Sequence, residues 1–148
     1  MENLTLVIPA KNEADSLPNV LKEIESFKCR KIIIIEENDQ DTIQSINSYD
    51  CKIIFQDKKG YGDAIIKGIN SVDTEYLCIF NADGSFNPKY LPEKLELCKN
   101  YDFIFSSRYM KGGGSDDDTF ITIIGNFIFS LLGNILFSLK LSDILYTF

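Results

Sequence analysis

Residues 76–88, YLCIFNADGSFNP, decide the fold that the sequence predicts. Residues 76–80 are apolar or nearly so and rich in strand-forming types, which predicts a buried strand in a sheet covered on both faces. The run ends at NADGS, so a carboxylate, Asp83, follows the carboxyl end of that strand. In open α/β sheets, ligands bind just outside these strand ends. Asp83 is a hard oxygen ligand suited to Mg²⁺ or Mn²⁺; alternatively, it only turns the chain or caps the next helix.

The composition limits the classes of function. A length of 148 residues suits one domain. The net charge of −7 argues against a nucleic-acid surface, because phosphate backbones attract clustered Lys and Arg. With no histidine and no CxxC pair among four cysteines, we expect neither the usual zinc sites nor a Ser-His or Cys-His nucleophile. Reduced cysteines and no signal peptide indicate a cytoplasmic protein.

Polar loops follow every predicted strand. The other strands are expected at residues 4–8, 31–35, 52–55 and 103–107, and helices alternate with them, the last at 91–99. This order predicts an α/β fold with a mostly parallel sheet flanked by helices. Because the polar loops all follow strands, they lie on one edge of the sheet. That mixed acidic and basic edge, which suits a metal–diphosphate ligand, carries Glu13, Glu37, Lys59, Asp83 and Arg108.

The C-terminal part has a different composition. Residues 120–139 are mostly Ile, Leu and Phe, carry no charge and are long enough to span a bilayer. A polar residue recurs at every fourth position, which gives a helix one winding polar seam. We expect one or two helices that lie on a membrane or pack under a partner; a spanning helix and a core helix are the alternatives. The seam residues are Thr122, Asn126, Ser130, Asn134 and Ser138.

Five motifs occur in register along the chain. They are PAKNE at 9–13, EENDQDT at 36–42, KKGYGDAIIKG at 58–68, NADGS at 81–85 and SSRYMKGGG at 106–114. Together they resemble the family 2 glycosyltransferases, most closely the branch that transfers mannose or glucose to dolichyl or polyprenyl phosphate. The resemblance implies a GT-A (Rossmann-like) fold and an enzyme that transfers a sugar, with inversion, from a nucleotide diphosphate donor of the GDP-mannose or UDP-glucose type.

The resemblance also implies cofactors, partners and domains. The cofactor would be Mg²⁺ or Mn²⁺, and the acceptor a polyprenyl or dolichyl phosphate. Residues 1–118 would form the nucleotide-sugar-binding domain, and residues 119–148 an apolar helical, membrane-associated segment. The protein would be a cell-envelope enzyme on the cytoplasmic side, peripheral on the membrane or anchored to it, and the chain would be the donor-binding half of a longer enzyme.

Site residues follow from matching positions in the motifs. Asp83 would be the metal carboxylate, with Ser85 beside the metal, and Arg108 a catalytic cation near phosphate. Glu37 would contact the base or ribose. The other donor-binding positions would be Pro9, Ala10 and Glu13 around the nucleoside, and Lys59, Gly60, Asn81 and Ala82 nearer the rest of the donor.

The sequence departs from the family pattern at three points. Asn81 replaces the first acid of the D-x-D-like motif, which removes one charge from the metal site. Glu36 and Glu37 stand where relatives have aspartates, and residues 121–125 (ITIIG) lack an arginine that many relatives carry. An alternative function is therefore a membrane-associated nucleotide-sugar-binding module, or inactive fragment, without turnover. A nucleotidyltransferase is a third option, although PAKNE is not the Gly-rich phosphate loop expected there.

Overall fold

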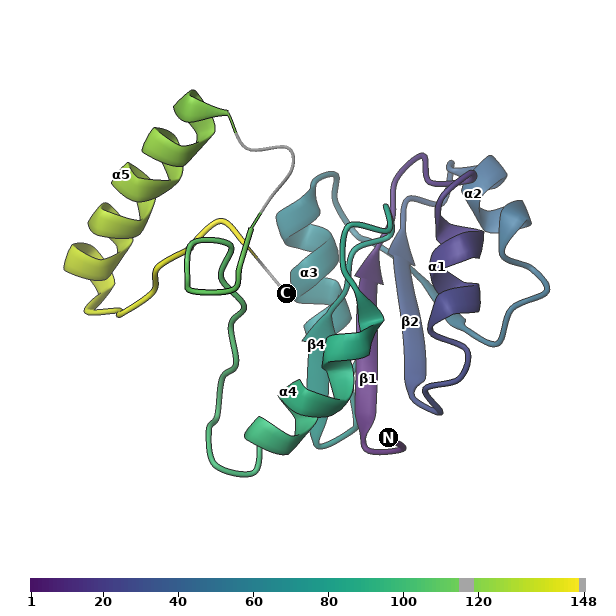
Figure 1. Ribbon diagram of the computed structural model, residues 1–148. Helices are drawn as coiled ribbons and strands as arrows, with labels where there is room; N and C mark the ends of the chain where they lie inside the picture. The colour runs from purple at the N-terminus through teal and green to yellow at the C-terminus, as the bar shows by residue number, and fades with distance from the viewer. Residues whose placement is uncertain (115–118, 147–148) are drawn as a thin grey trace. The chain divides into compact units, whose positions relative to one another are not determined.

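The protein consists of two units in the computed structural model, which describes residues 1–114 and 119–146. The first unit is Met1–Lys99 and the second is Asn100–Phe148. Figure 1 shows the sheet and its helices in the first unit and one long helix in the second. The domain boundary expected after residue 118 lies outside the described residues, so it stays a prediction.

The first unit is built on a parallel sheet of four strands (Figure 1). The strands are β1 (Leu4–Pro9), β2 (Arg30–Ile35), β3 (Lys52–Phe55) and β4 (Tyr76–Ile79), in the order β3-β2-β1-β4. Val7 of β1 lies opposite Ile32 of β2 on one side and Ile79 of β4 on the other. The α/β fold with a mostly parallel sheet, expected from the sequence, is confirmed.

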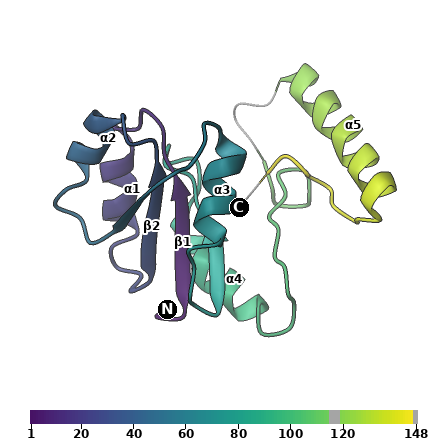
Figure 2. The ribbon, with the colours of Figure 1, turned by 180° about the vertical axis from the view of Figure 1, so that it is seen from behind.

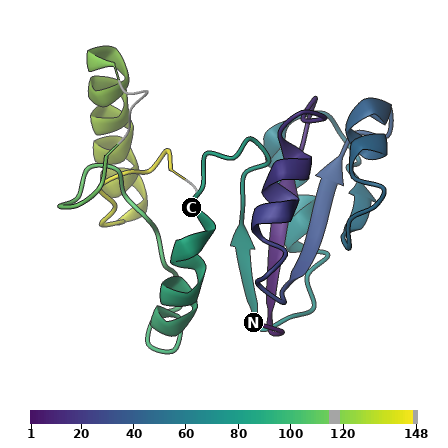
Figure 3. The same ribbon diagram turned by 45° about the vertical axis from the view of Figure 1, so that its right-hand side comes forward.

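Helices cover both faces of this sheet, as Figures 2 and 3 show from two sides. On one face, Ala64 of α3 (Tyr61–Ile69) packs with Val7, Ile32 and Ile34. Successive side chains of a strand point to opposite faces, so Leu6, Ile8, Ile33 and Ile35 face the other side. That face receives α1 (Leu17–Glu23), whose expected apolar residues are buried: Leu17, Val20, Leu21 and the adjoining Ile24.

The edge strands differ from expectation. β4 was expected to be buried on both faces, but it is one of the two edge strands of the sheet, and Leu77 is 42% exposed. The strand expected at residues 103–107 is also wrong: the structure has no strand there. The rings of Phe103 and Phe105 stack on each other, with centroids 6.2 Å apart, along this unpaired segment. Residues of strand-forming types favour an extended segment, but only a hydrogen-bonded neighbour makes it a strand.

Three shorter helical elements complete the first unit. α2 spans Gln40–Ser45, a 3₁₀ turn spans Pro88–Tyr90, and α4 spans Leu91–Leu97, two residues shorter than the expected 91–99. Two of them begin after a residue that starts helices well: Asp39 caps α2 by accepting a hydrogen bond from Thr42 N, and Asn87 caps the 3₁₀ turn that leads into α4.

In the second unit, the residues that the structure describes include one long helix, α5 (Phe120–Phe137). Thr119 and Thr122 form a capping box at its start, and the helix ends at Ser138, whose φ of 55° is left-handed. The apolar helical segment expected from the sequence is therefore confirmed as one helix. Its 18 residues, with a mean hydropathy of 2.0, are long and apolar enough to cross a membrane by length and composition.

Candidate functional site

The loops that follow the four parallel strands meet at one edge of the sheet in the first unit. Glu13, Glu37, Lys59 and Asp83 follow β1, β2, β3 and β4 respectively, so the structure brings these four expected positions to the same edge. Arg108, the fifth expected position, belongs to the second unit. The candidate site in the first unit is thus formed by loops, and the sheet behind them fixes where each loop starts.

Two adjoining hollows lie among these loops. The first, which we call the β2–β3 hollow, measures about 540 Å³, and the second, the β1–β2 hollow, about 400 Å³. Both fall in the size range of small-molecule sites. The β2–β3 hollow is lined by Glu36, Glu37, Asn38, Gln56, Asp57, Lys58 and Lys59. The β1–β2 hollow is lined by Lys11, Asn12, Glu36, Asn38, Asp39, Gln40, Asp41 and Lys59.

Glu36 is the carboxylate common to both hollows. Its side chain is only 13% exposed, and Lys11 Nζ lies 3.0 Å from Oε1. That approach lacks hydrogen-bond geometry, and within the described part of the chain Oε1 has no other hydrogen-bond donor. Oε1 thus has an ion pair but no hydrogen bond, so it can accept one from an O–H or N–H group of a ligand. From the sequence we singled out Glu37, which is exposed; the adjacent acid is the more enclosed one.

Hydrogen bonds join the β1 loop to the β2 loop. Asp39 Oδ2 accepts from the backbone N–H of Asn12 at 2.7 Å, and Thr42 Oγ1 accepts from the N–H of Glu13 at 2.9 Å. The carboxylate of Glu13 accepts a hydrogen bond from Ser16 at the start of α1. Glu13 therefore organises the loop locally in this structure, and its contact with a nucleoside stays a prediction.

Pro9 and Ala10 lie behind the loop rather than on its surface. Both are buried at the end of β1, and the N–H of Ala10 donates to Ile34 O at 2.9 Å. Their small apolar side chains lie beneath the β1 loop. Their expected contact with the nucleoside stays a prediction.

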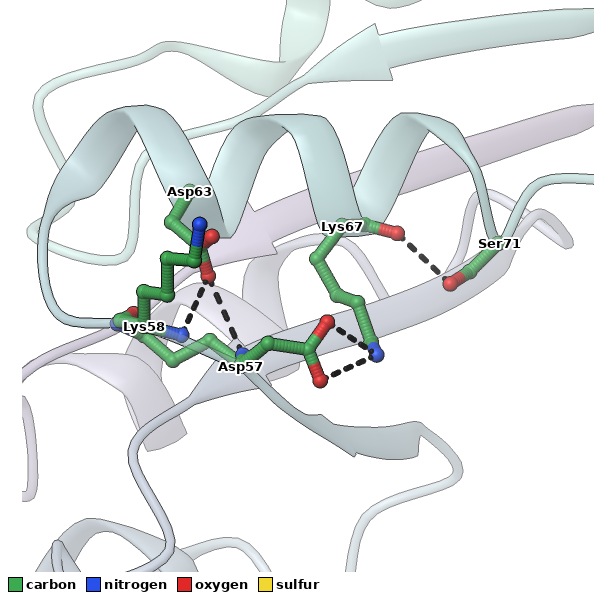
Figure 4. A network of polar contacts seen from close by, with 6 residues as sticks. Asp57, Lys58, Asp63, Lys67 and Ser71 are labelled. Carbon is green, nitrogen blue, oxygen red and sulfur yellow. Dashed lines mark hydrogen bonds and ion pairs between the residues drawn. The ribbon is translucent and has the colours of Figure 1, made fainter.

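The loop from β3 to α3 is held by acidic side chains, as Figure 4 shows. Asp63 Oδ2 accepts from the backbone N–H groups of Asp57 and Lys58, at 3.2 and 3.0 Å, and Lys67 Nζ lies 2.9 and 2.8 Å from the two carboxylate oxygens of Asp57. Gly60 precedes α3 with φ of 114°, a conformation that favours glycine. These contacts fix the backbone that carries Lys58 and Lys59. Asp63 was missed from the sequence, although an acid at the third position of a helix is a known capping signal.

Asp83 lies in a turn whose polar groups bind one another. Its Oδ1 accepts from the N–H of Ser85 at 2.9 Å, and Asn81 Nδ2 donates to Ser85 Oγ at 3.0 Å. Gly84 has φ of 79°, and Ala82 is buried beneath the turn. The turn-forming role weighed for Asp83 is therefore present in the structure.

The oxygen atoms of the same turn are of the types that bind a hard cation. Asp83 offers a carboxylate, Asn81 an amide oxygen and Ser85 a hydroxyl, and Mg²⁺ prefers such ligands. Over residues 1–114 and 119–146, no group of three His, Cys, Asp or Glu side chains could hold a metal by itself. The donor set fits a cation that is shared with the phosphates of a ligand, the usual arrangement for Mg²⁺.

Arg108 is engaged within the second unit. Its Nε and Nη2 lie 2.8 and 3.0 Å from the two oxygens of Asp143, whose side chain is fully buried. The rings of Tyr109 and Tyr146 each lie 5.3 Å from the guanidinium carbon. Burial alone raises the pKa of Asp143, but the hydrogen bonds from Arg108 outweigh it, so the pKa lies below its ordinary value. The role of Arg108 near phosphate stays a prediction; Asp143 was not foreseen as its partner.

Comparisons with known proteins identify relatives of the chain. The family model described as Glycosyl transferase family 2 matches residues 5–145. Uncharacterized glycosyltransferases of Mycobacterium bovis and Mycobacterium tuberculosis are 29% identical to the chain over 106 residues, which is 71% of this chain and 48% of each relative. The chain thus spans about half the length of these curated relatives.

A solved structure shares the fold. The glucosyl-3-phosphoglycerate synthase of Mycobacterium tuberculosis, solved in complex with phosphoglyceric acid, matches with a TM-score of 0.59 and 15% identity. The match covers 69% of this chain and 41% of that one. At this identity the similarity concerns the fold, and it confirms the Rossmann-like GT-A architecture.

Proposed function

Because the chain belongs to glycosyl transferase family 2 over residues 5–145, we propose that it forms the donor-binding part of an enzyme that transfers a sugar from a nucleotide diphosphate to an acceptor. The observation that carries the proposal is the pair of adjoining hollows at the carboxyl edge of the parallel sheet. Ligands of open α/β sheets bind at this edge, and a nucleoside diphosphate has the size and the mixed polarity of the two hollows.

The charges in the hollows suit the two ends of such a donor. Carboxylates accept hydrogen bonds from ribose hydroxyls in related dinucleotide sites, and the buried Oε1 of Glu36 offers such an acceptor. Lys11, Lys58 and Lys59 line the same hollows and carry charges opposite to a diphosphate. In the proposal, base and ribose lie against Glu36 and Glu37, and the diphosphate lies near Lys59.

We place the metal of the proposed reaction at Asp83, with Ser85 beside it. Mg²⁺ or Mn²⁺ there would supply charge stabilisation for the leaving diphosphate. The hydrogen bond from the N–H of Ser85 orients the carboxylate of Asp83. Arg108 enters the proposal as a fixed cation near phosphate, its guanidinium oriented by Asp143.

The proposed acceptor is a lipid phosphate of the polyprenyl or dolichyl type. A phosphate monoester has its second pKa near ~6, so it is largely ionised at neutral pH and needs little help from a base. The sequence has no histidine to serve as that base. A phosphate nucleophile therefore suits this chain better than a sugar hydroxyl, which would need a positioned carboxylate.

A second candidate is a nucleotide-sugar-binding module without turnover, and Asn81 favours it. At the position of the first acid of the D-x-D-like motif, its amide donates to Ser85 Oγ, and Asp83 supplies the only charge of that motif. Release of nucleoside diphosphate from a nucleotide sugar by the purified chain would rule against this candidate.

The test of the proposal is calorimetric titration of the chain with GDP and with UDP, each in Mn²⁺ and in EDTA. We expect one nucleotide to bind, and Lys59→Ala to weaken that binding about tenfold through the loss of a charge-assisted contact. Lys28→Ala is the matched control, because Lys28 is an exposed lysine before β2, at the opposite edge of the sheet. A folded chain that binds neither nucleotide would overturn the proposal.

The same titration tests the metal position. We expect Asp83→Ala to abolish the difference between Mn²⁺ and EDTA, whereas Asp50→Ala, which removes an exposed acid before β3, keeps it. Metal-dependent binding that survives in Asp83→Ala would place the cation elsewhere.

A further inference from the structure

The loop between β3 and α3 supplies both lysines of the β2–β3 hollow, yet apolar burial does not hold it. Residues 57–62 are all exposed, so the shape of the loop depends on hydrogen bonds. Both of its ends are tied to regular structure. The N–H of Gln56 donates to Ile35 O of β2 at 3.0 Å, and Gly60 O accepts from the N–H of Ala64 in α3 at 3.2 Å.

Asp63 of α3 holds the middle of this loop. Its Oδ2 accepts from the backbone N–H groups of Asp57 and Lys58, at 3.2 and 3.0 Å, as Figure 4 shows. Together with the hydrogen bond at Gly60, these contacts hold the backbone on both sides of Lys59. Lys59 lines both hollows, so Asp63 sets the point from which its side chain reaches the site.

The same face of α3 supplies a second tie. Lys67 lies four residues after Asp63, and residues at this spacing are neighbours on a helix surface. Its Nζ lies 2.9 and 2.8 Å from the two carboxylate oxygens of Asp57, whose side chain points along α3 toward it in Figure 4. Because Asp57 also lines the β2–β3 hollow, this pairing reduces the repulsion between its charge and a diphosphate.

The charge of Asp63 separates two possible roles. An acid beside the lysines of a diphosphate site opposes an anionic ligand through its field. Its hydrogen bonds act in the other direction, because a lysine whose backbone is already held loses less conformational freedom when the ligand binds. We propose that Asp63 is a positioning residue of the donor site, which holds Lys59 in place for the diphosphate.

This inference rests on the proposed function, because it takes Lys59 as a contact of the donor diphosphate. It adds a residue to which the proposed function gives no role. Asp63 contacts only the loop and not the donor in this proposal, so its effect on binding should pass through Lys59.

The test is calorimetric titration in Mn²⁺ with GDP and UDP, and with GMP and UMP. Asp63→Ala should weaken binding of the diphosphate that the wild-type chain binds by about tenfold. Binding of the matching monophosphate should change by less than about twofold, which also shows that the variant is folded. Diphosphate binding that is unchanged or tighter would overturn the proposal, because the loss of an acid acts in that direction through charge alone. Equal weakening of both ligands would also overturn it.

Two further variants test the route of the effect. Asp63→Asn keeps an oxygen that can accept from both N–H groups, so it should cost less than about threefold; a loss as large as in Asp63→Ala would overturn the hydrogen-bonding role. Asp63→Ala combined with Lys59→Ala should weaken binding by about tenfold in total, because the second change removes a contact already impaired. An additive loss of about a hundredfold would mean that Asp63 does not act through Lys59.

A matched control and a measurement without nucleotide complete the design. Glu93→Ala also removes an acid at the third position of a helix, α4, but Glu93 is exposed and lines neither hollow, so binding should not change. Hydrogen exchange at the amides of Asp57 and Lys58 should be faster in Asp63→Ala than in the wild-type chain, and equal exchange would overturn the proposal. A wild-type chain that binds neither nucleotide overturns the proposed function and this inference together. Wild-type binding with an unaffected Asp63→Ala variant overturns this inference alone.

Discussion

Helices α3 and α5 bury opposite kinds of surface. α3 places Ala64 and Gly68 against the apolar side chains of the central strands, and its charged residues face outward. α5 places Asn126, Ser130 and Gly133 inward and leaves its apolar residues outside. The first unit is therefore held by apolar burial, which is non-directional, and the described part of the second by directional hydrogen bonds and one ion pair. The two units should respond differently to the same kind of change.

The largest effect is expected in the second unit, from Asp143→Ala. The variant removes the buried carboxylate that accepts two hydrogen bonds from the Arg108 guanidinium, and breaking such a pair by removing one member costs about 3 kcal/mol. We expect rapid hydrogen exchange at the amides of Leu141 and Ile144, measured by mass spectrometry in detergent micelles. Ser142→Ala, which removes an exposed hydroxyl contact with Ser107, is the control and should change little. Unchanged protection in Asp143→Ala would show that the ion pair does not hold the unit together.

In the first unit, Gly68→Ala should cost about 2 kcal/mol of unfolding free energy. The added methyl group would collide with Val7 Cγ1 and lie 3.1 Å from Ile34 Cγ1, and both atoms belong to β-branched side chains fixed in the sheet. Urea denaturation followed by circular dichroism measures the cost. Gly62→Ala in the same helix meets nothing within 4 Å, and it should stabilise by about 0.5 kcal/mol instead. Equal stabilities of the two variants would mean that α3 does not pack on the sheet as closely as described.

Acid should loosen the second unit through its ion pair. The pKa of Asp143 lies below its ordinary value of 3.8 because hydrogen bonds from Arg108 outweigh the effect of burial. The pair therefore stabilises the unit fully above pH 3.8, and this contribution is lost as the pH falls through the lower pKa of the folded state. The loss should be smaller than in Asp143→Ala, because a protonated carboxyl still accepts hydrogen bonds. Asp143→Asn should remove the pH dependence of Ile144 amide protection; a dependence that persists would belong to another group.

The fold of the first unit was largely predictable because its signals are local. Residues 4–8 and 31–35 are apolar except for Thr5 and Lys31, and such runs are typical of the central strands of a parallel sheet. Residues 103–107 begin with three apolar residues, but the prediction of a strand there was wrong. Strand formation requires a neighbour, and in the described structure this segment has no paired strand. The exposure of β4 was also missed, because the sequence does not state which strands lie at the edges of the sheet.

The positions of the candidate site residues were predictable from the sequence, but the residues that they contact were not. Glu37 and Lys59 were found because they follow strands, and both line the β2–β3 hollow. Glu36 was not chosen as a donor-binding residue, because the sequence does not show which of two adjacent acids is the more enclosed. Arg108 and Asp143 pair although they lie 35 positions apart in the sequence. No local sequence pattern predicts a contact between residues so far apart. Long-range side-chain pairing is the part that the structure had to supply.

The smallest effect should come from Gly133→Ala, and it sharpens the contrast between the units. A methyl group there would collide with Ile144 Cδ1, the far end of a flexible side chain, whereas Ile144 Cγ1 is 3.8 Å away. Because Ile144 can rotate, the cost should be below about 1 kcal/mol, and the higher helix propensity of Ala offsets most of it. Gly125→Ala meets nothing within 4 Å and should show the full gain. Exchange of the Ile144 amide measures both variants. A cost at Gly133 as large as that at Gly68 would mean that the second unit is packed as rigidly as the first, and that its polar seam is a tight core instead of a hydrogen-bonded lining.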